Sequence, residues 1–328
     1  MAATCPRGHN LIIASAGTGK TSTIVGRISY LLQNGVAPSS ILLLTFTNKA
    51  ASEMISRIEA YFDKETAKAI NSGTFHSVSY KLLKQNNIDI TLKQPGELKT
   101  LFKSLYEKRI FSYSCGTNPY DGGYLYDLFS LYLNSNNLET FAEWIIEKNN
   151  SHEPHAIIYE DIAKEYMSTK TRFGYASFDD ILVQMHIMLQ NAKIEFEEIL
   201  VDEYQDTNPL QGRLLDAFNS KSLFCVGDYD QSIYAFNGSD ISIISTFAKR
   251  YNDSNIFTLT KNYRSTKPIL ELANQVIANN ERIYEKKLEV TRTHSEHNPM
   301  LLEFGELFDQ YSYIAQNISQ TQTPKENI

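Results

Sequence analysis

The chain has 328 residues, of which 42% are hydrophobic, 12% aromatic and 21% charged, a composition typical of a globular protein with two or three domains. It has no apolar run near the roughly 18 residues that a membrane-spanning helix needs, and its three scattered cysteines argue against a disulfide framework or a zinc or iron–sulfur site, so we expect a cytoplasmic protein with no membrane partner. The net charge of −7 by itself disfavours a nucleic-acid partner, but the acidic excess is concentrated in residues 191–240, and a chain with segregated charges can still present a basic surface to phosphates.

The N-terminal part alternates apolar strands with amphipathic helices. An apolar run over 11–14 leads through a glycine-rich turn into a helix predicted over 20–33, which Asn34-Gly35 ends. A buried-type strand over 41–46 is followed by a helix predicted over 48–62. Near-continuous apolar strands that alternate with helices are typical of a parallel, doubly wound sheet.

The pattern changes in the middle of the chain. From about 85 to 170 it is mostly helical with polar loops and no clear strand, which predicts an inserted helical subdomain. Strands return over 197–203, 222–228 and 255–263, and a further helix follows with Pro268 in its first turn. The sequence therefore predicts one α/β unit interrupted by helices.

The turn after the first strand reads ASAGTGKT. Its glycines allow a tight turn that aims backbone N–H groups at a phosphate, Lys20 can reach the β- and γ-phosphates, and the Thr21 hydroxyl can hold Mg²⁺. Ala14 stands where the pattern G-x-x-x-x-G-K-[ST] has its first glycine. The predicted nucleotide contacts in this loop are Ala16, Gly17, Thr18, Gly19, Lys20, Thr21 and Ser22.

Acidic residues follow the predicted strand ILVDEYQD. Asp202 lies at the carboxyl end of that strand, where it can hold Mg²⁺ through water. Glu203 is adjacent and can accept a proton from an attacking water. An exposed acidic strand end is the alternative interpretation, which the pairing with a phosphate-binding loop in one sheet disfavours.

A third segment, VGDYDQSIYAFNGS, also begins at a strand end. Gln231 carries an amide that can sense a γ-phosphate by hydrogen bonding. Tyr234 and Phe236 can stack on nucleobases, and such stacking contributes about 1–3 kcal/mol per base. By spacing alone, these two aromatic residues are equally compatible with packing against a neighbouring domain.

Two shorter stretches, TFTNKAA and GTFHS, place hydroxyls, amides and an aromatic ring after strands. Contacts of this kind track the backbone of single-stranded nucleic acid. In the stretch NYRS, Arg264 follows the last strand, where a guanidinium can reach a γ-phosphate from another domain.

Taken in order, ASAGTGKT, LLLTFTNKAA, GTFHS, VDEYQDTN, VGDYDQSIYAFNG and LTKNYRS resemble motifs I, Ia, Ib, II, III and IV of superfamily 1A DNA helicases of the UvrD/Rep/PcrA type. The resemblance implies a RecA-like P-loop NTPase fold, α/β with a parallel sheet, an inserted helical subdomain and the start of a second RecA-like domain. Residues 1–84 and 172–253 would form the ATP-binding domain 1A, residues 85–171 the helical domain 1B, and residues 254–328 the incomplete start of domain 2A. ATP would lie between 1A and 2A, and single-stranded DNA would cross the top of both.

The resemblance also assigns roles to residues. Lys20, Thr21 and Asp202 would serve the phosphates and Mg²⁺, Glu203 would be the catalytic base, and Gln231 would couple the γ-phosphate to the DNA side. Tyr263 would stack on the adenine and Arg264 would contact the γ-phosphate. The residues expected to contact DNA are Thr45, Phe46, Thr47, Asn48, Thr74, His76, Tyr234 and Phe236.

The function implied is that of an ATP-dependent 3′→5′ single-stranded DNA translocase or helicase, a monomer that acts on DNA junctions beside repair or replication proteins. The sequence shows no motif V or VI, no large 2B insertion and no adenine-reading glutamine before residue 2, and motif III has Ala235 and Asn237 where the family usually has arginine near the aromatic residue. We interpret the chain as an N-terminal fragment of a longer helicase. Because a missing arginine finger costs about 10³–10⁵ in rate, we expect weak binding, little or no ATP hydrolysis and no unwinding from this chain alone.

Two other interpretations compete with this one. A GTPase would need the guanine-reading pattern N-K-x-D, but Ala51 stands where Asn48-Lys49 would require the aspartate, and an ABC ATPase would need a signature that the chain lacks. The chain can alternatively be a nucleotide-gated module that binds nucleic acid or protein without motor activity. The intact set of Lys20, Asp202 and Glu203 argues against that alternative.

Overall fold

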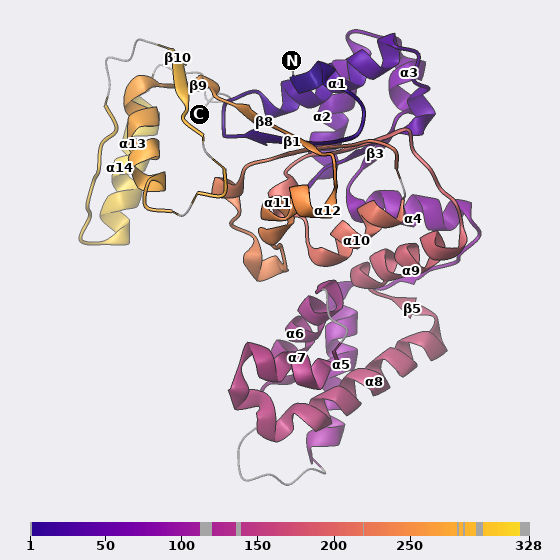
Figure 1. Cartoon of the computed structure of the whole chain (residues 1–328). Coiled ribbons are helices and arrows are strands. Elements are labelled where there is room, and N and C mark those ends of the chain that lie inside the picture. The colour runs from indigo at the N-terminus through magenta and orange to yellow at the C-terminus, as the bar shows by residue number, and fades with distance from the viewer. Residues whose placement is uncertain are drawn as a thin grey trace.

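The structure is a computed structural model that describes residues 2–111, 120–135, 139–218, 220–280, 282–284, 286–292 and 298–321, with only the backbone of Phe111 and Asn237. The parts of the predicted inserted domain and second domain that fall in the gaps lie outside the described residues. Figure 1 shows a central body built around a sheet, a lobe of helices below it, and an outer part formed by the segments from β9 onward.

Strands and helices alternate along the body as the sequence predicts. The strands are β1 (His9–Ala14), β2 (Ile41–Leu44), β3 (Asn71–Gly73), β4 (Thr91–Leu92), β5 (Tyr175–Ala176), β6 (Glu198–Val201), β7 (Leu223–Gly227), β8 (Asn255–Leu259), β9 (Lys261–Thr266) and β10 (Glu289–Arg292). The α-helices are α1 (Lys20–Gln33), α2 (Asn48–Glu59), α3 (Lys64–Ala69), α4 (Phe75–Gln85), α5 (Pro95–Phe111), α6 (Gly122–Asn134), α7 (Phe141–Lys148), α8 (Ala156–Phe173), α9 (Phe178–Asn191), α10 (Pro209–Ala217), α11 (Ser242–Ser245), α12 (Phe247–Arg250), α13 (Lys267–Ile277) and α14 (Leu307–Gln320).

The central sheet has six strands in the order β3-β2-β6-β7-β1-β8, and every neighbouring pair is parallel. The prediction of an α/β fold with a parallel sheet is therefore confirmed. Because all six strands run the same way, the loops that follow them meet at one edge of the sheet. That edge carries the phosphate-binding loop after β1, the acidic residues after β6 and the third segment after β7.

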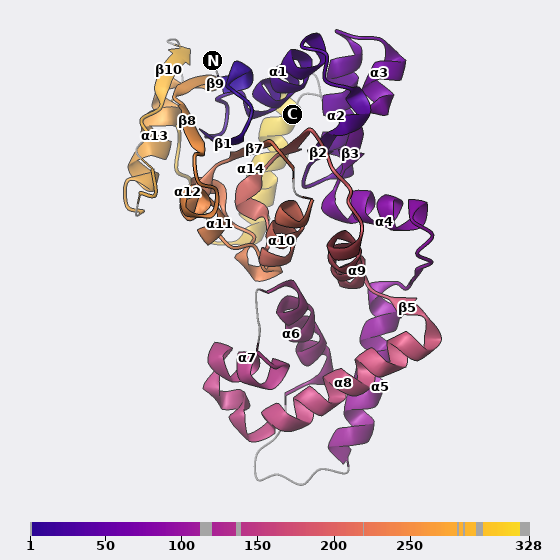
Figure 2. The ribbon, with the colours of Figure 1, turned by 45° about the vertical axis from the view of Figure 1, so that its right-hand side comes forward.

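Helices cover both faces of this sheet (Figure 2). Alternate strand residues point to opposite sides, so Leu11 and Ile13 of β1 pack under α4, α9 and α10, whereas Ile12 packs under α1, α2 and α3. This division explains why the inner strands β2 and β7 are apolar, since both of their faces are buried. It also fixes the phosphate-binding loop between a buried strand and a buried helix.

The inserted segment forms a lobe with a core of its own. Helices α5 to α8 bury a cluster centred on Phe102, Phe129 and Tyr166, separate from the two cores of the sheet. The two-residue strands β4 and β5 pair with each other where the lobe joins the body. The sequence shows no sign of β4, because a two-residue strand is too short to produce an alternating pattern.

The structure divides the predicted strand over 255–263 in two. β8 pairs with β1 at the edge of the central sheet, whereas β9 pairs with β10 in a separate two-stranded sheet. Only Thr260 separates them. The boundaries of the predicted domains stay a prediction; the structure places β8, which they assign to the second domain, in the first sheet.

Among the described helices, none is both long enough and apolar enough to cross a membrane. The described residues also contain no group of three or more His, Cys, Asp or Glu side chains placed to hold a metal ion. Cys5 and Cys225 are free and buried, while Cys115 lies outside the described residues.

Candidate nucleotide cleft and nucleic-acid interface

The loop between β1 and α1 has the backbone that a phosphate-binding loop needs. Gly17 and Gly19 have φ angles of +78° and +93°, in the left-handed region that side chains disfavour. A Cβ atom on Gly17 would also lie 2.5 Å from the Cβ of Arg264. Glycine is therefore required at Gly17 both by the turn and by the close approach of β9.

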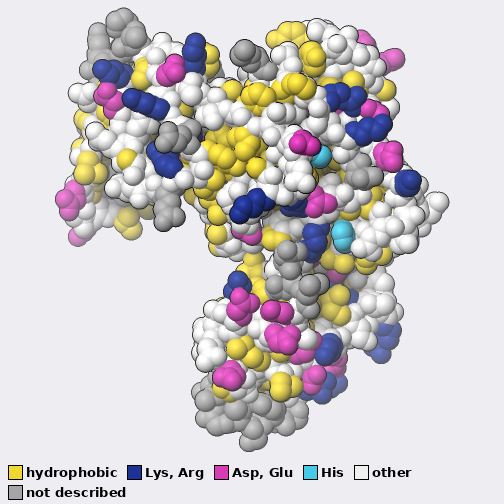
Figure 3. Space-filling view, viewed as in Figure 1, with side chains coloured by type: hydrophobic (Ala, Val, Ile, Leu, Met, Phe, Trp, Pro, Cys, Tyr) yellow, Lys and Arg dark blue, Asp and Glu magenta, His cyan; other side chains and the backbone are white. Residues whose placement is uncertain are grey.

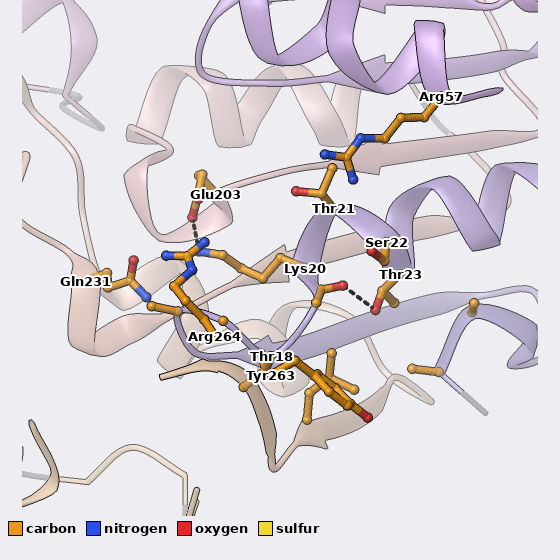
Figure 4. A pocket seen from close by; sticks show the side chains of 16 residues that line it. Thr18, Lys20, Thr21, Ser22, Thr23, Arg57, Glu203, Gln231, Tyr263 and Arg264 are labelled. Carbon is orange, nitrogen blue, oxygen red and sulfur yellow. Dashed lines mark hydrogen bonds and ion pairs between the residues drawn. The ribbon is translucent and has the colours of Figure 1, made fainter. Parts of the chain in front are cut away.

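This loop forms one wall of a cleft of about 780 Å³. Figure 4 shows Lys20, Glu203 and Arg264 directed toward the same space, with Gln231 at its side. The Nζ of Lys20 lies 2.6 Å from Oε2 of Glu203. The cleft is lined by Ala2, Ala3, Ala16, Gly17, Thr18, Gly19, Lys20, Thr21, Ser22, Thr23, Arg57, Glu203, Gln231, Leu259, Tyr263 and Arg264.

All seven predicted loop contacts line this cleft, but the hydroxyl of Thr18 is turned inward. Its side chain is buried, and both its hydroxyl and its backbone N–H donate to the carbonyl of Ser15, over 2.7 and 3.1 Å. Thr18 therefore stabilises the loop from inside. The structure brings Ala16, Thr21 and Ser22 to the lining, and their contact with a nucleotide stays a prediction.

Two carboxylates behind the cleft, Asp202 and Asp206, are only partly satisfied by the residues that the structure describes. One buried oxygen of Asp202 and one of Asp206 have no hydrogen-bond partner among the described residues. Burial, and then the neighbouring charge of Glu203, raise the pKa of Asp202 to about 6, and the same two causes raise the pKa of Asp206 to about 6. Oxygen ligands of this kind suit Mg²⁺. The residues present therefore fit a magnesium ion held near Asp202, with Asp206 as a second, unpredicted acid.

Glu203 is held in an uncommon conformation. Its φ and ψ angles are both 49°, the left-handed region in which a residue other than glycine is strained by about 1–3 kcal/mol. The side-chain amide of Gln205 donates to Oε2 of Glu203 over 2.9 Å and to Asp206 over 3.1 Å. Gln205 is buried, so it fixes where the carboxylate of Glu203 points.

The segment after β7 is tied to this acidic group. The backbone N–H of Asp228 donates to Oε1 of Gln205 over 2.9 Å. The side-chain amide of Gln231 donates in turn to Oδ2 of Asp228. Glu203 and Gln231 are thus connected through two intermediate residues, the side chain of Gln205 and the backbone and side chain of Asp228, and both line the cleft.

A second wall, adjoining the loop, comes from β9. The side-chain amide of Asn262 donates to the carbonyl of Ala16 over 2.8 Å, and the N–H of Tyr263 donates to the carbonyl of Gly17 over 2.8 Å. Oδ1 of Asn262 accepts the N–H groups of Arg264 and Ser265. Asn262 therefore holds Arg264 against the phosphate-binding loop, while the Tyr263 ring stays 56% exposed and available for stacking.

A second cavity, of about 470 Å³, adjoins the cleft. Asp202, Glu203 and Gln231 line one part of it, and Phe46 and Tyr234 line another. The rings of Phe46 and Tyr234 are 5.0 Å apart between centroids, and those of Tyr234 and Phe236 are 6.0 Å apart. The structure thus brings together three rings predicted to contact DNA, and two of them, Phe46 and Phe236, are 48% and 70% exposed.

The predicted hydroxyl and amide contacts are used locally as well. Thr47 caps α2, and Thr74 caps α4 in a reciprocal pair with Ser77. Thr45 is buried, and its hydroxyl donates to the carbonyl of Thr47 over 2.8 Å. Oδ1 of Asn48 accepts a hydrogen bond from Ser77 over 3.1 Å. These side chains already have structural partners, so their contact with DNA stays a prediction.

A third cavity, of about 480 Å³, lies between the body and the helical lobe. His76, Phe178 and Phe236 line it, and the rings of His76 and Phe178 meet edge to face at 6.0 Å. Burial lowers the pKa of His76, against a smaller opposing effect of the carboxylate of Asp179. Asp179 in turn accepts hydrogen bonds from two side chains of α6, which fasten the lobe to α9.

Charged side chains are dispersed on the face that Figure 3 shows. Its dark-blue lysine and arginine side chains lie among other residue types over the central body, and acidic side chains gather on the helical lobe. On this face, the described residues offer scattered cations and not a continuous basic surface. The aromatic row of Phe46, Tyr234 and Phe236 is an indication of a nucleic-acid site that does not depend on such a surface.

Several residues that shape the site have no role among the predictions from the sequence. Gln205 and Asp206 belong to the segment VDEYQD, so their closeness to Glu203 in the sequence could have identified them as site residues. Asn262 stands beside the predicted Tyr263 in the same way. Arg57 lies late in α2 and lines the cleft only because α2 packs beside α1.

Comparison with known proteins gives two family matches. The family described as "UvrD/REP helicase N-terminal domain" matches residues 1–252, and the family described as "UvrD-like helicase C-terminal domain" matches residues 257–328. The change from one family to the other falls within the loop before β8 and the start of that strand.

Individual relatives agree with these matches. The chain is 34% identical over 314 residues to the putative ATP-dependent DNA helicase YjcD of Bacillus subtilis, covering 89% of this chain and 39% of that protein. It is 32% identical over 299 residues to DNA helicase II of Haemophilus influenzae, covering 84% and 39%. It is 34% identical over 306 residues to the ATP-dependent DNA helicase PcrA of Staphylococcus aureus, covering 88% and 40%. The chain thus spans about two fifths of the length of these relatives.

Proposed function

The chain belongs to the UvrD/Rep helicase family, and from this membership we propose that it binds ATP and Mg²⁺ in the cleft between the β1–α1 loop and β9. We propose further that hydrolysis there drives movement of single-stranded DNA over the aromatic row of Phe46, Tyr234 and Phe236. The relatives are named as DNA helicases, which supports this assignment.

One observation carries the proposal. Glu203 and Gln231 line both the nucleotide cleft and the neighbouring cavity that contains Phe46 and Tyr234. A change at the γ-phosphate that moves either side chain is therefore passed directly to the aromatic row. A motor protein needs such a contact between the site that binds its nucleotide and the site that binds DNA.

The residues of the cleft supply the functions that hydrolysis requires. A bound Mg²⁺ would supply charge neutralisation at the β- and γ-phosphates. Lys20 binds the same phosphates once it leaves Glu203, and Thr21 and Asp202 hold the metal. Glu203, freed from Lys20, takes a proton from the attacking water.

The remaining cleft residues orient the nucleotide. Gln231 and Arg264 donate hydrogen bonds to the γ-phosphate from opposite walls, which stabilises charge as it develops. Tyr263 stacks on the adenine. On the DNA side, Thr45, Thr47, Asn48, Thr74 and His76 follow the phosphate backbone near the aromatic rings.

The finer features of the activity rest on the family alone. We propose 3′→5′ movement, action at DNA junctions as a monomer, and a role beside replication or repair proteins. We also propose that turnover by this chain alone is low. The proposal of low turnover is supported by the lining of the cleft. Among the described residues beyond 257, Arg264 is the one arginine in that lining, so charge developing on the γ-phosphate has one guanidinium from this part of the chain.

Coupling of nucleotide to DNA binding tests the proposal. A labelled oligothymidine is titrated with the chain at low salt, without nucleotide, with ADP and with ATPγS, each with Mg²⁺. We expect the Kd for DNA to differ by about fivefold or more between the two nucleotides, because coupled sites exchange roughly 1–3 kcal/mol. DNA affinity that is the same in all three conditions rejects a motor, and nucleotide binding without DNA binding favours the nucleotide-gated interaction module.

A further inference from the structure

Lys286 is a buried lysine that reaches from the outer part of the molecule into the segment after β7. Its side chain is only 4% exposed, and its Nζ forms an ion pair with Oδ1 of Asp228 and lies 2.7 Å from Oδ2 of Asp230. The same Nζ lies 4.4 Å from the centre of the Tyr229 ring. Arg282 adds a second cation, 3.1 Å from Asp230.

The two carboxylates depend on these cations. The side chains of Asp228 and Asp230 are 2% and 8% exposed, so water does little to stabilise their charges. Within the part of the chain that the structure describes, Arg282 pairs with Asp230 and not with Asp228, so Lys286 is the ion-pair partner of Asp228 there. A buried charge that loses its partner is strongly destabilised, and the group then takes up a proton or turns toward solvent.

Asp228 uses its two oxygens for three partners, one of which is the backbone N–H of Asp230, which donates to Oδ1 over 3.3 Å. Oδ1 pairs with Lys286, whereas Oδ2 accepts the hydrogen bond of Gln231. The backbone N–H of Asp228 is fixed separately by Gln205. The side-chain rotation of Asp228, and with it the position of the Gln231 amide, is therefore held by Lys286 together with the N–H of Asp230.

We propose that Lys286 is a positioning residue for Gln231. Through Asp228 it holds the Gln231 amide toward the γ-phosphate, and because it belongs to residues 257–328 it does so only when the outer part is docked against the body. This inference rests on the proposed function, since it gives Gln231 a γ-phosphate to read.

Selectivity between nucleotides tests the inference without relying on turnover. Fluorescent ADP and fluorescent ATPγS are titrated with Mg²⁺ against the wild-type chain, Lys286→Met and Lys286→Arg. Only ATPγS carries the group that Gln231 contacts, so we expect Lys286→Met to reduce the preference for ATPγS roughly tenfold, the size of one hydrogen bond to a charged group. Affinity for ADP should stay unchanged, and Lys286→Arg should restore most of the preference.

Matched variants separate positioning from stability. Lys287→Met is the control, because Lys287 is adjacent, exposed and makes no ion pair with a described residue. In a Gln231→Ala background, Lys286→Met should have no further effect, since both changes remove the same contact. If Lys286→Met does not fold by circular dichroism, Lys286→Gln replaces it, because its amide keeps one hydrogen bond to Asp228 without the charge.

The outcomes distinguish the two claims. A wild-type chain that binds neither nucleotide overturns the proposed function and the inference with it. A wild-type chain that prefers ATPγS, with a Lys286→Met variant that keeps this preference, overturns the inference alone. Equal affinity of the wild type for both nucleotides also overturns the inference alone, because Gln231 then reads no γ-phosphate.

Discussion

The Nζ of Lys20 lies 2.6 Å from Oε2 of Glu203, so the cation of the phosphate-binding loop and the carboxylate after β6 neutralise each other across the cleft. Both groups have a second task in the proposed function, one toward phosphate and one toward water. The ion pair therefore has to open when a nucleotide binds. The first two predictions concern its two members.

Glu203→Gln should separate binding from hydrolysis. Glutamine cannot accept a proton, so single-turnover hydrolysis of radiolabelled ATP should fall by about 10²–10⁴. Affinity for ATPγS should stay equal or rise, because Lys20 no longer has to leave a carboxylate. Glu195→Gln is the control, since Glu195 is exposed and outside the cleft lining. Hydrolysis that survives Glu203→Gln would show that the base is a different residue.

Lys20→Ala should lose nucleotide affinity. The change removes a charged hydrogen bond to phosphate, worth about 1.5–3 kcal/mol, so the Kd for ATPγS should rise roughly tenfold to a hundredfold. The measurement is a fluorescence titration beside Lys64→Ala, an exposed lysine at the start of α3. An unchanged Kd would place the phosphates away from the β1–α1 loop.

Phe236→Ala should weaken binding of single-stranded DNA while leaving nucleotide binding intact. The ring is 70% exposed, so its removal costs little stability. The lost stacking, about 1–3 kcal/mol per base, should raise the Kd for oligothymidine roughly fivefold to a hundredfold. Tyr61→Ala is the matched control, because Tyr61 is 75% exposed but follows α2 on the other side of the sheet. Equal effects of the two changes would reject the aromatic row as the DNA site.

Gly17→Ala should damage the cleft itself. The positive φ of 78° and a contact of 2.5 Å with the Cβ of Arg264 both oppose a side chain, so we expect a loss of about 1–3 kcal/mol in the free energy of unfolding. Nucleotide affinity should fall too, because β9 is pushed from the loop. Gly96→Ala is the control, since a Cβ there meets nothing within 4 Å. Similar unfolding curves for the two variants would contradict this account.

His76 should make the protein less stable in mild acid. Burial lowers its pKa in the folded state below the ordinary value of 6.5. Above pH 7.5 both states are neutral and the shift has no effect, but as the pH falls through 6.5 the unfolded state takes up the proton more readily. Between pH 8 and pH 5.5, wild type should therefore lose free energy of unfolding relative to His76→Gln, measured by urea unfolding. A constant difference over that range would mean that His76 is not shielded.

The sequence predicted those parts of the site that follow directly from strand ends. Lys20, Asp202 and Gln231 stand just after β1, β6 and β7, and parallel strands bring their ends together whatever the details of packing. The α/β class and the helical insertion follow from the same patterns. A residue beside a strand end can therefore be placed without a structure.

Residues whose position depends on packing were not predictable in this way. Lys286 lies 58 positions from Asp228, and nothing in its neighbourhood marks a buried ion pair. The division of the predicted strand at Thr260 was also hidden, because the residues on both sides have strand-forming patterns. For Thr45 and Thr74, whether a hydroxyl faces solvent, bonds within its loop or caps a helix depends on local geometry that the sequence does not show.

Thr260 is all that separates the last strand of the central sheet from the first strand of the outer part. A one-residue connection is too short to absorb a rotation of β9 relative to β8. Such a rotation therefore displaces Asn262 and Tyr263, which lie two and three residues after Thr260. These two residues hold the carbonyls of Ala16 and Gly17. The amide proton of Tyr263 is protected by its hydrogen bond to Gly17 and should exchange with solvent only when β9 separates from the loop. Its exchange rate would therefore report how often the cleft opens.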